Sequence, residues 1–168
     1  AQPVARAERP RASRLGSRRA LRAGARSALP LKRSMGVLDH SVATLRFFGD
    51  DLIPEALSSL LGASPTEAHA KGEEIIGRTT GQVRIAKTGS WRLKAERRQP
   101  EDLEAQIFEL LAKLTDDLSV WASLSRYEPD LFCGIFMASS NDGLPLSAKA
   151  LLALGQRGIA LDLDIYDC

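Results

Sequence analysis

The sequence predicts an α+β fold, a two-layer sandwich in which helices pack on one face of a mixed or antiparallel sheet of about four to five strands. Residues 159–166 alternate apolar side chains with polar or small ones, which is the period of a half-buried strand. Residues 131–138 are apolar on both faces, so they predict a central strand. Residues 100–114 place Leu and Ile at the spacing of one helical stripe, which needs a sheet to cover.

The first part of the predicted domain supplies a strand, a helix and a long connection. Residues 41–48 are rich in β-branched and aromatic side chains and predict the first strand. Pro54 suits the first turn of a helix with three leucines on one face, and Gly62 is expected to end it. Residues 63–82 are polar, and a connection of this length inside a compact domain is often functional or mobile.

Two short strands are predicted next, at 83–87 and 90–96, joined as a hairpin by a turn at Thr88 and Gly89. In the second of these strands, Trp91 and its alternate neighbours share one face and the basic side chains share the other. This pairing would place a basic hairpin next to another strand of the sheet.

Further helices complete the predicted order β-α-β-β-α-α-β-α-β, which contains no internal repeat. Pro100 is expected to begin the longest helix, and a shorter helical piece follows it. Ser147 is expected to cap a last helix in which Leu151, Leu152 and Leu154 point inward. The closing strand, 159–166, would then be covered by the amphipathic helices.

Charge is divided unevenly along the 168 residues. Residues 1–35 contain ten Lys or Arg and one acid, a balance of +9, whereas residues 36–168 contain thirteen bases and twenty acids, a balance of −7. We therefore expect a disordered basic leader at 1–35 and a single α+β domain at 36–168. Three origins stay open for the leader: a targeting segment, an arm for nucleic acid or another anionic surface, or translation upstream of a native start at Met35.

The composition also indicates the cellular compartment that we expect for the protein. No apolar run approaches the roughly 20 residues needed to span a bilayer, so we expect no membrane segment. Cys133 and Cys168 are far apart in the sequence, which is neither a disulfide framework nor a metal site. This favours the cytoplasm, and it favours Cys133 as inert core rather than as a nucleophile.

Several short motifs share the order and spacing of one known family. They are the strand 41–48, the turn 49–55 into the first helix, the pairs Leu61-Gly62, Pro65-Thr66, Lys71-Gly72 and Ser90-Trp91, the helix 100–114 and the ending 158–166. Over about residues 41–167 the chain thus resembles the small bacterial family named domain of unknown function 4279. The resemblance implies a compact cytosolic bacterial domain that begins near Met35, and it brings no catalytic residue with it.

One candidate site consists of acidic side chains on the last strand. Asp162 and Asp164 share a face there, with their Cβ atoms about 6.5–7 Å apart. They favour either of two interpretations. A hard cation could bind between the two carboxylates, with or without catalysis. Alternatively, the two aspartates are simply exposed to solvent or, if the basic hairpin neighbours the last strand, they pair with Arg92 and Lys94.

A second candidate site is aromatic. Helices can cover one face of the segment 131–138, which leaves two phenylalanine rings on its other face and a third ring on the same side of the sheet. Left exposed, these rings would form an interface patch; covered by loop 63–82 or by the short helical piece, they would be core. The predicted binding residues are Phe48, Phe132, Phe136, Arg92 and Lys94.

These observations favour a non-enzymatic protein-binding or regulatory module that acts through the sheet face and the 63–82 loop. It could form a homodimer, or bind a partner in the manner of small bacterial immunity proteins. No phosphate-binding loop, nucleophile elbow or helical histidine pair is present, and we expect no cofactor. A metal-dependent enzyme or metal binder centred on Asp162 and Asp164 is the alternative, so enzymatic activity stays open. A third possibility is anion or nucleic-acid binding by the leader; the acidic remainder does not favour nucleic acid.

Overall fold

The computed structural model describes residues 38–77, 79 and 81–167. These residues form a five-stranded mixed sheet, a separate pair of short strands and four α-helices, which confirms the predicted α+β fold. The predicted basic leader at residues 1–35 lies outside the described residues. None of the helices in the described part is long and apolar enough to cross a membrane.

The sheet has the strand order β2-β5-β1-β6-β7. Its central strand is β1 (His40–Gly49), which pairs antiparallel with β5 (Gly89–Lys94) on one side and with β6 (Asp130–Phe136) on the other. The edge strands are β2 (Glu67–His69), antiparallel to β5, and β7 (Ala160–Tyr166), parallel to β6. The parallel pair makes the sheet mixed.

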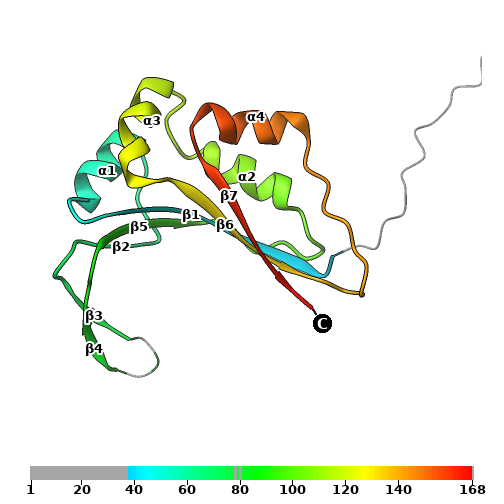
Figure 1. Cartoon of the computed structure of the whole chain (residues 1–168), viewed down its shortest axis with the longest axis horizontal. Helices are drawn as coiled ribbons and strands as arrows, with labels where there is room; N and C mark the ends of the chain where they lie inside the picture. Colours follow the sequence, from blue (N-terminus) through cyan, green and yellow to red (C-terminus); the bar gives the residue numbers. More distant parts are fainter. Residues whose placement is uncertain (1–37, 78, 80, 168) are drawn as a thin grey trace, which may run out of the picture. The chain divides into compact units, whose positions relative to one another are not determined.

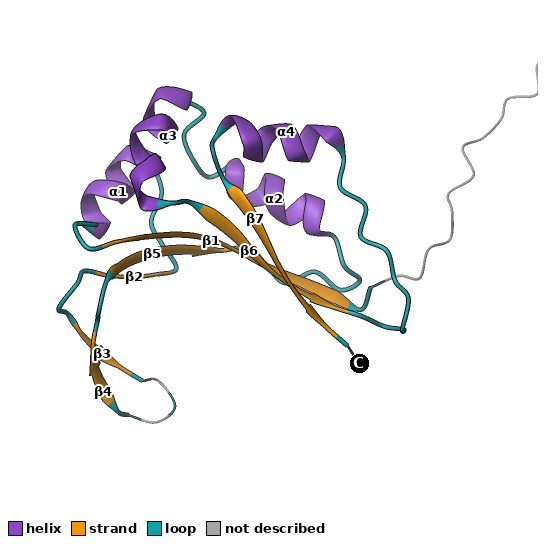
Figure 2. Cartoon of the chain, viewed as in Figure 1, coloured by secondary structure: helices purple, strands orange, loops and turns teal. Residues whose placement is uncertain are grey.

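All four helices lie on the same side of this sheet (Figures 1 and 2). In chain order they are α1 (Pro54–Leu61), α2 (Leu103–Leu111), α3 (Leu118–Leu124) and α4 (Ala148–Gln156). A short 3-10 helix (Ser125–Tyr127) continues α3. The arrangement is therefore a two-layer sandwich, with one layer of helices and one layer of strands.

β1 carries the centre of the core on one of its two faces. Its odd-numbered side chains, including Leu45 and Phe47, are buried under the helices, and its even-numbered side chains lie on the opposite face. The Phe47 ring packs edge-on against Trp91 of β5, with centroids 5.6 Å apart, and stacks on Trp121 of α3 at 6.1 Å. Alternation along one strand thus decides which side chains of the sheet meet the helices.

The predicted caps are partly confirmed. Ser147 caps α4, because its side chain accepts a hydrogen bond from the backbone N–H of Ala150. The helix expected from Pro100 begins at Leu103 instead, because Asp102 serves as its N-cap. Gly62 ends α1 with a positive φ of 76°, as the sequence predicted.

The predicted 83–96 hairpin is wrong. β4 (Val83–Ile85) pairs instead with β3 (Glu74–Ile76), which lies inside the long connection. The two strands form an arm that projects from the end of the sheet where β5 begins, away from the helices (Figure 2). Gly89 does not turn the chain between two paired strands. A Cβ atom there would lie 2.8 Å from the Gly49 carbonyl oxygen, so Gly89 permits the close approach of β5 to β1.

The closing strand is an edge strand rather than a fully covered one. Ile159 is buried just before β7, but Leu163 is 39% exposed and Ile165 is 60% exposed. α4 presents Ala150 and Leu154 to the core, one helical turn apart, whereas the leucines at 151 and 152 are exposed. The expectation that Leu151 and Leu152 point inward is therefore wrong, and only the start of β7 is covered.

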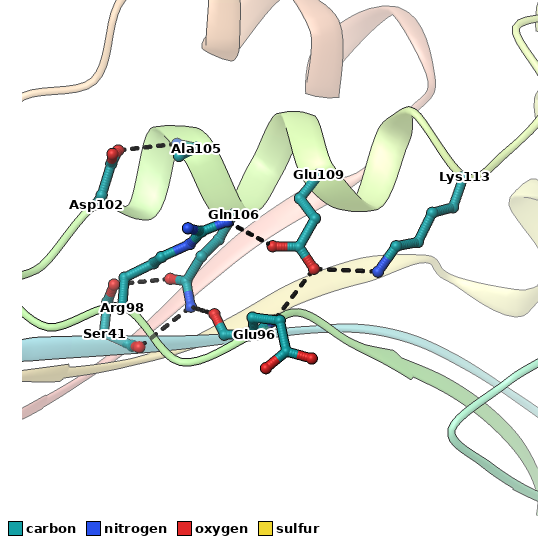
Figure 3. Close-up of polar contacts among 8 residues, drawn as sticks. All are labelled: Ser41, Glu96, Arg98, Asp102, Ala105, Gln106, Glu109 and Lys113. Atoms are coloured by element: carbon teal, nitrogen blue, oxygen red, sulfur yellow. Dashed lines mark hydrogen bonds and ion pairs between the residues drawn. The ribbon is translucent and has the colours of Figure 1, made fainter.

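A buried glutamine connects α2 to the sheet. The Gln106 side chain accepts a hydrogen bond from the Ser41 hydroxyl at 2.7 Å, and it donates to the Ser41 carbonyl at 3.1 Å and the Glu96 carbonyl at 2.7 Å (Figure 3). Gln106 and Ser41 are both fully buried. A single side chain thus satisfies polar groups of β1 and of the segment after β5 that would otherwise face an apolar core.

Replacing Gln106 is expected to destabilise the fold. In Gln106→Leu, the Ser41 hydroxyl and the Glu96 carbonyl lose the Gln106 partner, and the Ser41 carbonyl keeps only its bond from the Arg98 N–H; we expect the free energy of unfolding to fall by about 2–3 kcal/mol. Urea denaturation followed by circular dichroism measures this. Lys113→Ala, which removes an i,i+4 ion pair between the turn after α2 and Glu109, should change the same quantity by less than about 0.5 kcal/mol. Equal losses in the two variants would contradict this role of Gln106.

Candidate functional site

The face of the sheet opposite the helices, called the open face, has none of the described helices over it (Figure 2). The pairing register places side chains of all five strands on it. These are Glu67 and His69 of β2; Ser90, Arg92 and Lys94 of β5; His40, Val42, Thr44, Arg46 and Phe48 of β1; Asp130, Phe132, Gly134 and Phe136 of β6; and Asp162, Asp164 and Tyr166 of β7.

Arg46 is the centre of this face. Its guanidinium donates to both carboxylate oxygens of Asp130, at 2.7 and 2.9 Å, and to Asp162 at 3.1 Å. The hydrogen bonds with Asp130 are the main cause that raises the pKa of Arg46 above its usual value. The same guanidinium lies 4.3 Å from the centroid of the Phe132 ring and 5.6 Å from that of Phe48. One side chain thus joins β1, β6 and β7.

A stack of three rings crosses the other end of the open face. The Phe136 ring lies between His40 of β1, with centroids 4.0 Å apart, and Tyr166 of β7, with centroids 4.7 Å apart. Both pairs are nearly parallel, at 10° and 9°. The Tyr166 hydroxyl donates to Asp164, and this hydrogen bond raises the pKa of the Tyr166 phenol. The rings therefore cover one another rather than standing singly in solvent.

A cavity of about 240 Å³ lies between the open face and the β3–β4 arm. Phe48 and Ser90 line it from the sheet, and Arg84, Ile85 and Lys87 line it from β4 and the segment that follows. Arg92 and His69 complete the wall. Three cationic side chains, those of Arg84, Lys87 and Arg92, thus line the same cavity.

The sequence profile of the family described as Domain of unknown function (DUF4279) matches residues 39–168. The chain belongs to this family. The resemblance inferred from the short motifs is thereby confirmed, and the match spans every strand and helix from β1 to β7. The open face and the cavity are consequently both made by the DUF4279 segment. No curated protein and no solved structure matches the chain.

Within this DUF4279 fold, the five predicted binding residues share one face but do not form one cluster. Phe48 and Phe132 lie on either side of Arg46, and Phe136 belongs to the separate ring stack. Arg92 reaches the Phe48 ring from β5, with 5.6 Å between guanidinium and centroid. Lys94 lies beyond it on an exposed part of the same strand. All three rings are partly buried by their neighbours on the open face.

Sequence reasoning missed Arg46, although a signal for it was present. Arg46 stands two residues before Phe48 in the first strand, so the alternation that placed Phe48 on the open face also places Arg46 there. Tyr166 follows Asp164 at the same spacing. The contacts of Arg46 with β6 and β7, and the stacking of Tyr166 on Phe136, depend on the strand order, which the alternation does not reveal.

The expected pairing of Arg92 and Lys94 with Asp162 and Asp164 is wrong. β1 and β6 lie between β5 and β7, so Lys94 and Asp162 share a row of the sheet but stand three strands apart, about 14 Å. Arg46 supplies the structural cation instead. Among the described residues, no group of three or more His, Cys, Asp or Glu side chains is placed to hold a metal ion.

Cys133 lies on the helix-covered face of β6 and is completely buried. Burial, with a smaller contribution from the nearby Asp162 carboxylate, raises the pKa of its thiol to about 12. At neutral pH the thiol is protonated, and a protonated, inaccessible thiol is a poor nucleophile.

A thiol-labelling experiment tests this assignment. In a Cys168→Ser variant at pH 8, we expect Cys133 to resist iodoacetamide in the folded chain, because reaction needs the thiolate and the raised pKa keeps its fraction low until the pH approaches 12. Addition of denaturant should expose Cys133 and permit complete alkylation, measured by mass spectrometry. Rapid alkylation of the folded chain at pH 8 would contradict the buried, inert assignment.

The metal hypothesis for Asp162 and Asp164 has its own test. Calorimetric titration with Ca²⁺, Mg²⁺ and Mn²⁺ should give no binding heat that depends on these residues, because Arg46 and Tyr166 already contact their carboxylates. The comparison is with the Asp162→Asn, Asp164→Asn double variant. Saturable binding by the wild-type chain that is lost in the double variant would support the metal site instead.

Proposed function

We propose that this DUF4279 protein is a non-enzymatic module that binds another protein through its open face and the 63–82 loop. The observation that carries the proposal is the open face itself, where arginine and aromatic side chains cluster with none of the described helices over them. Arg, Tyr and Phe are enriched in protein–protein interfaces, and Arg and Tyr also at the positions that contribute most to binding. Loop 63–82 adds β2 to this face and β3 to the arm beside it.

The groups already in place favour binding over catalysis. The Arg46 guanidinium holds two carboxylates, Tyr166 holds a third, and the Cys133 thiol is buried away from the open face. His69 lies 3.3 Å from the Ser90 hydroxyl, but Ser90 is itself buried. We therefore assign these side chains to the structure of a binding surface rather than to a reaction.

A different protein is a better occupant than a second copy of the chain. Residues 36–168 carry a net charge of −7, so two copies of this domain, taken without the basic segment 1–35, repel each other at long range. Regulatory binding of this kind includes toxin neutralisation in the manner of small bacterial immunity proteins. We place this activity in the bacterial cytoplasm, which the free Cys133 thiol and the absence of a disulfide framework in the sequence support.

Site-specific photo-cross-linking tests the proposal. A photo-reactive amino acid replaces Lys94 on the open face or, as the matched control, Lys113 in the turn after α2; both lysines are exposed. In cells of the native host, we expect a heterologous cross-linked product from position 94 and none from position 113. With the captured protein purified, Phe132→Ala should weaken binding by at least about tenfold, because the ring is part of the Arg46 cluster.

Three outcomes would contradict the proposal. They are no product from either position, products of equal yield from both, and a partner that binds wild type and Phe132→Ala alike. A product with twice the mass of the chain would show a homodimer on this face instead of a different partner.

A further inference from the structure

The cavity between the open face and the β3–β4 arm carries an excess of positive charge. Arg84, Lys87 and Arg92 line it, and no carboxylate does. Within the described residues, no acidic side chain forms an ion pair with Arg84 or Lys87. We call this space the basic cavity.

Arg92 is only weakly neutralised by its neighbours. Its closest acidic contact is Glu67 on β2, where the nitrogen–oxygen distance is 4.0 Å. Its Nε atom is buried and lacks a hydrogen-bond partner. A buried guanidinium nitrogen without a partner is unfavourable, and an oxyanion in the cavity would neutralise the charge of this side chain.

The carboxylate of Asp50, in the turn after β1, has partners of its own. Asp50 accepts a hydrogen bond from Lys71, and this contact is the main cause that lowers the pKa of Asp50, with a second contribution from Thr88. These bonds tie the start of the arm and the segment after β4 to the turn after β1. Asp50 therefore holds the cavity wall in place without neutralising the cations inside it.

The walls also restrict the size and the kind of the anion. Phe48, Ile85 and Ala86 supply apolar surface, so the ligand combines an anionic group with a short apolar stem. A volume of about 240 Å³ is enough for one or two side chains and not for a long polyanion. The charge of −7 on residues 36–168 further disfavours nucleic acid, whose binding depends on summed phosphate contacts. An Asp or Glu side chain meets both requirements.

We propose that the basic cavity receives an acidic side chain from the partner protein, with its carboxylate contacting Arg84, Lys87 and Arg92 and its stem against Phe48 and Ile85. This inference rests on the proposed function and adds the chemistry of the partner, an exposed acidic segment. Arg92 and Phe48 belong at the same time to the open face, so the cavity is continuous with the surface that binds the rest of the partner.

A peptide titration tests the proposal directly. The probe is a hexapeptide of alternating Glu and Leu, blocked at both ends, and its control has Gln in place of Glu. Titration into the ¹⁵N-labelled full chain should shift the amide signals of Ala86, Thr88 and Ser90 saturably with the Glu peptide only. Higher salt should weaken the binding, because screening reduces the charge attraction.

Matched variants locate the binding site. Arg84→Gln with Lys87→Gln should weaken binding of the Glu peptide at least about tenfold, since two charge-assisted contacts are lost. Lys113→Gln with Lys149→Gln removes the same charge from exposed positions away from the open face and should change the affinity less than about twofold. Equal weakening in the two double variants, or equal binding of the Glu and Gln peptides, would overturn the proposal.

Two further measurements distinguish a protein carboxylate from a free small anion, and the cavity inference from the proposed binding function. Free succinate or inorganic phosphate that binds as tightly as the peptide would make the cavity a small-anion site and overturn the partner assignment. If the protein cross-linked from position 94 binds the Arg84→Gln, Lys87→Gln variant as tightly as wild type, the cavity inference fails while the binding function stands. If position 94 captures nothing, the binding function fails whatever the peptide does.

Discussion

A sheet with helices on one side only must stabilise its other side with its own side chains, and Arg46 meets this constraint. A bare row of partly buried phenylalanines would be an aggregation hazard, and an unpaired arginine between them would be costly. The guanidinium lies between Phe132 and Phe48 while its nitrogens contact Asp130 and Asp162, so each group satisfies another. Because these residues come from β1, β6 and β7, the same cluster also fixes the parallel edge strand to the sheet.

This use of Arg46 explains why the acidic pair of the last strand is structural. From the sequence, Asp162 and Asp164 resemble a cation site, because two carboxylates share a strand face. In the fold, Asp162 faces a guanidinium two strands away and Asp164 faces a phenol on its own strand. The cations of the open face thus differ: Arg46 is satisfied by carboxylates, whereas Arg92, next to the arm, has a buried Nε atom without a hydrogen-bond partner. Arg46 therefore stabilises the sheet, whereas the cationic side chains of the basic cavity remain available to a ligand.

Much of the fold was predictable, because periodicity reports which face of an element is buried. The strands at 41–48 and 131–138, the Ser147 cap and the sharing of one face by Phe48, Phe132 and Phe136 all follow from local patterns. Strand order does not follow, because it depends on long-range pairing. Gly89 shows the limit: a turn and a close approach to Gly49 both require glycine, and only the neighbour distinguishes them.

The same limit applies to the candidate site. Alternation placed Arg92 on the open face correctly, but its partners were assigned to β7, which is three strands away. The basic cavity could not be predicted, because β3 lies in a polar connection and its pairing with β4 brings Arg84 over the sheet only in the folded chain.

The arm makes the basic cavity dependent on a few contacts at its base. A pair of three-residue strands has little stability of its own, and Ile76 and Val83 are exposed on it at 66% and 58%. What fixes the arm are backbone hydrogen bonds between Glu73 and Ala86 and between Gly72 and Ala86, together with the Lys71 contact to Asp50. Arg84 and Lys87 stand on either side of Ala86, so these contacts set their positions relative to Arg92. The arrangement of the three cations is therefore a property of the anchored base and not of the strand pair alone.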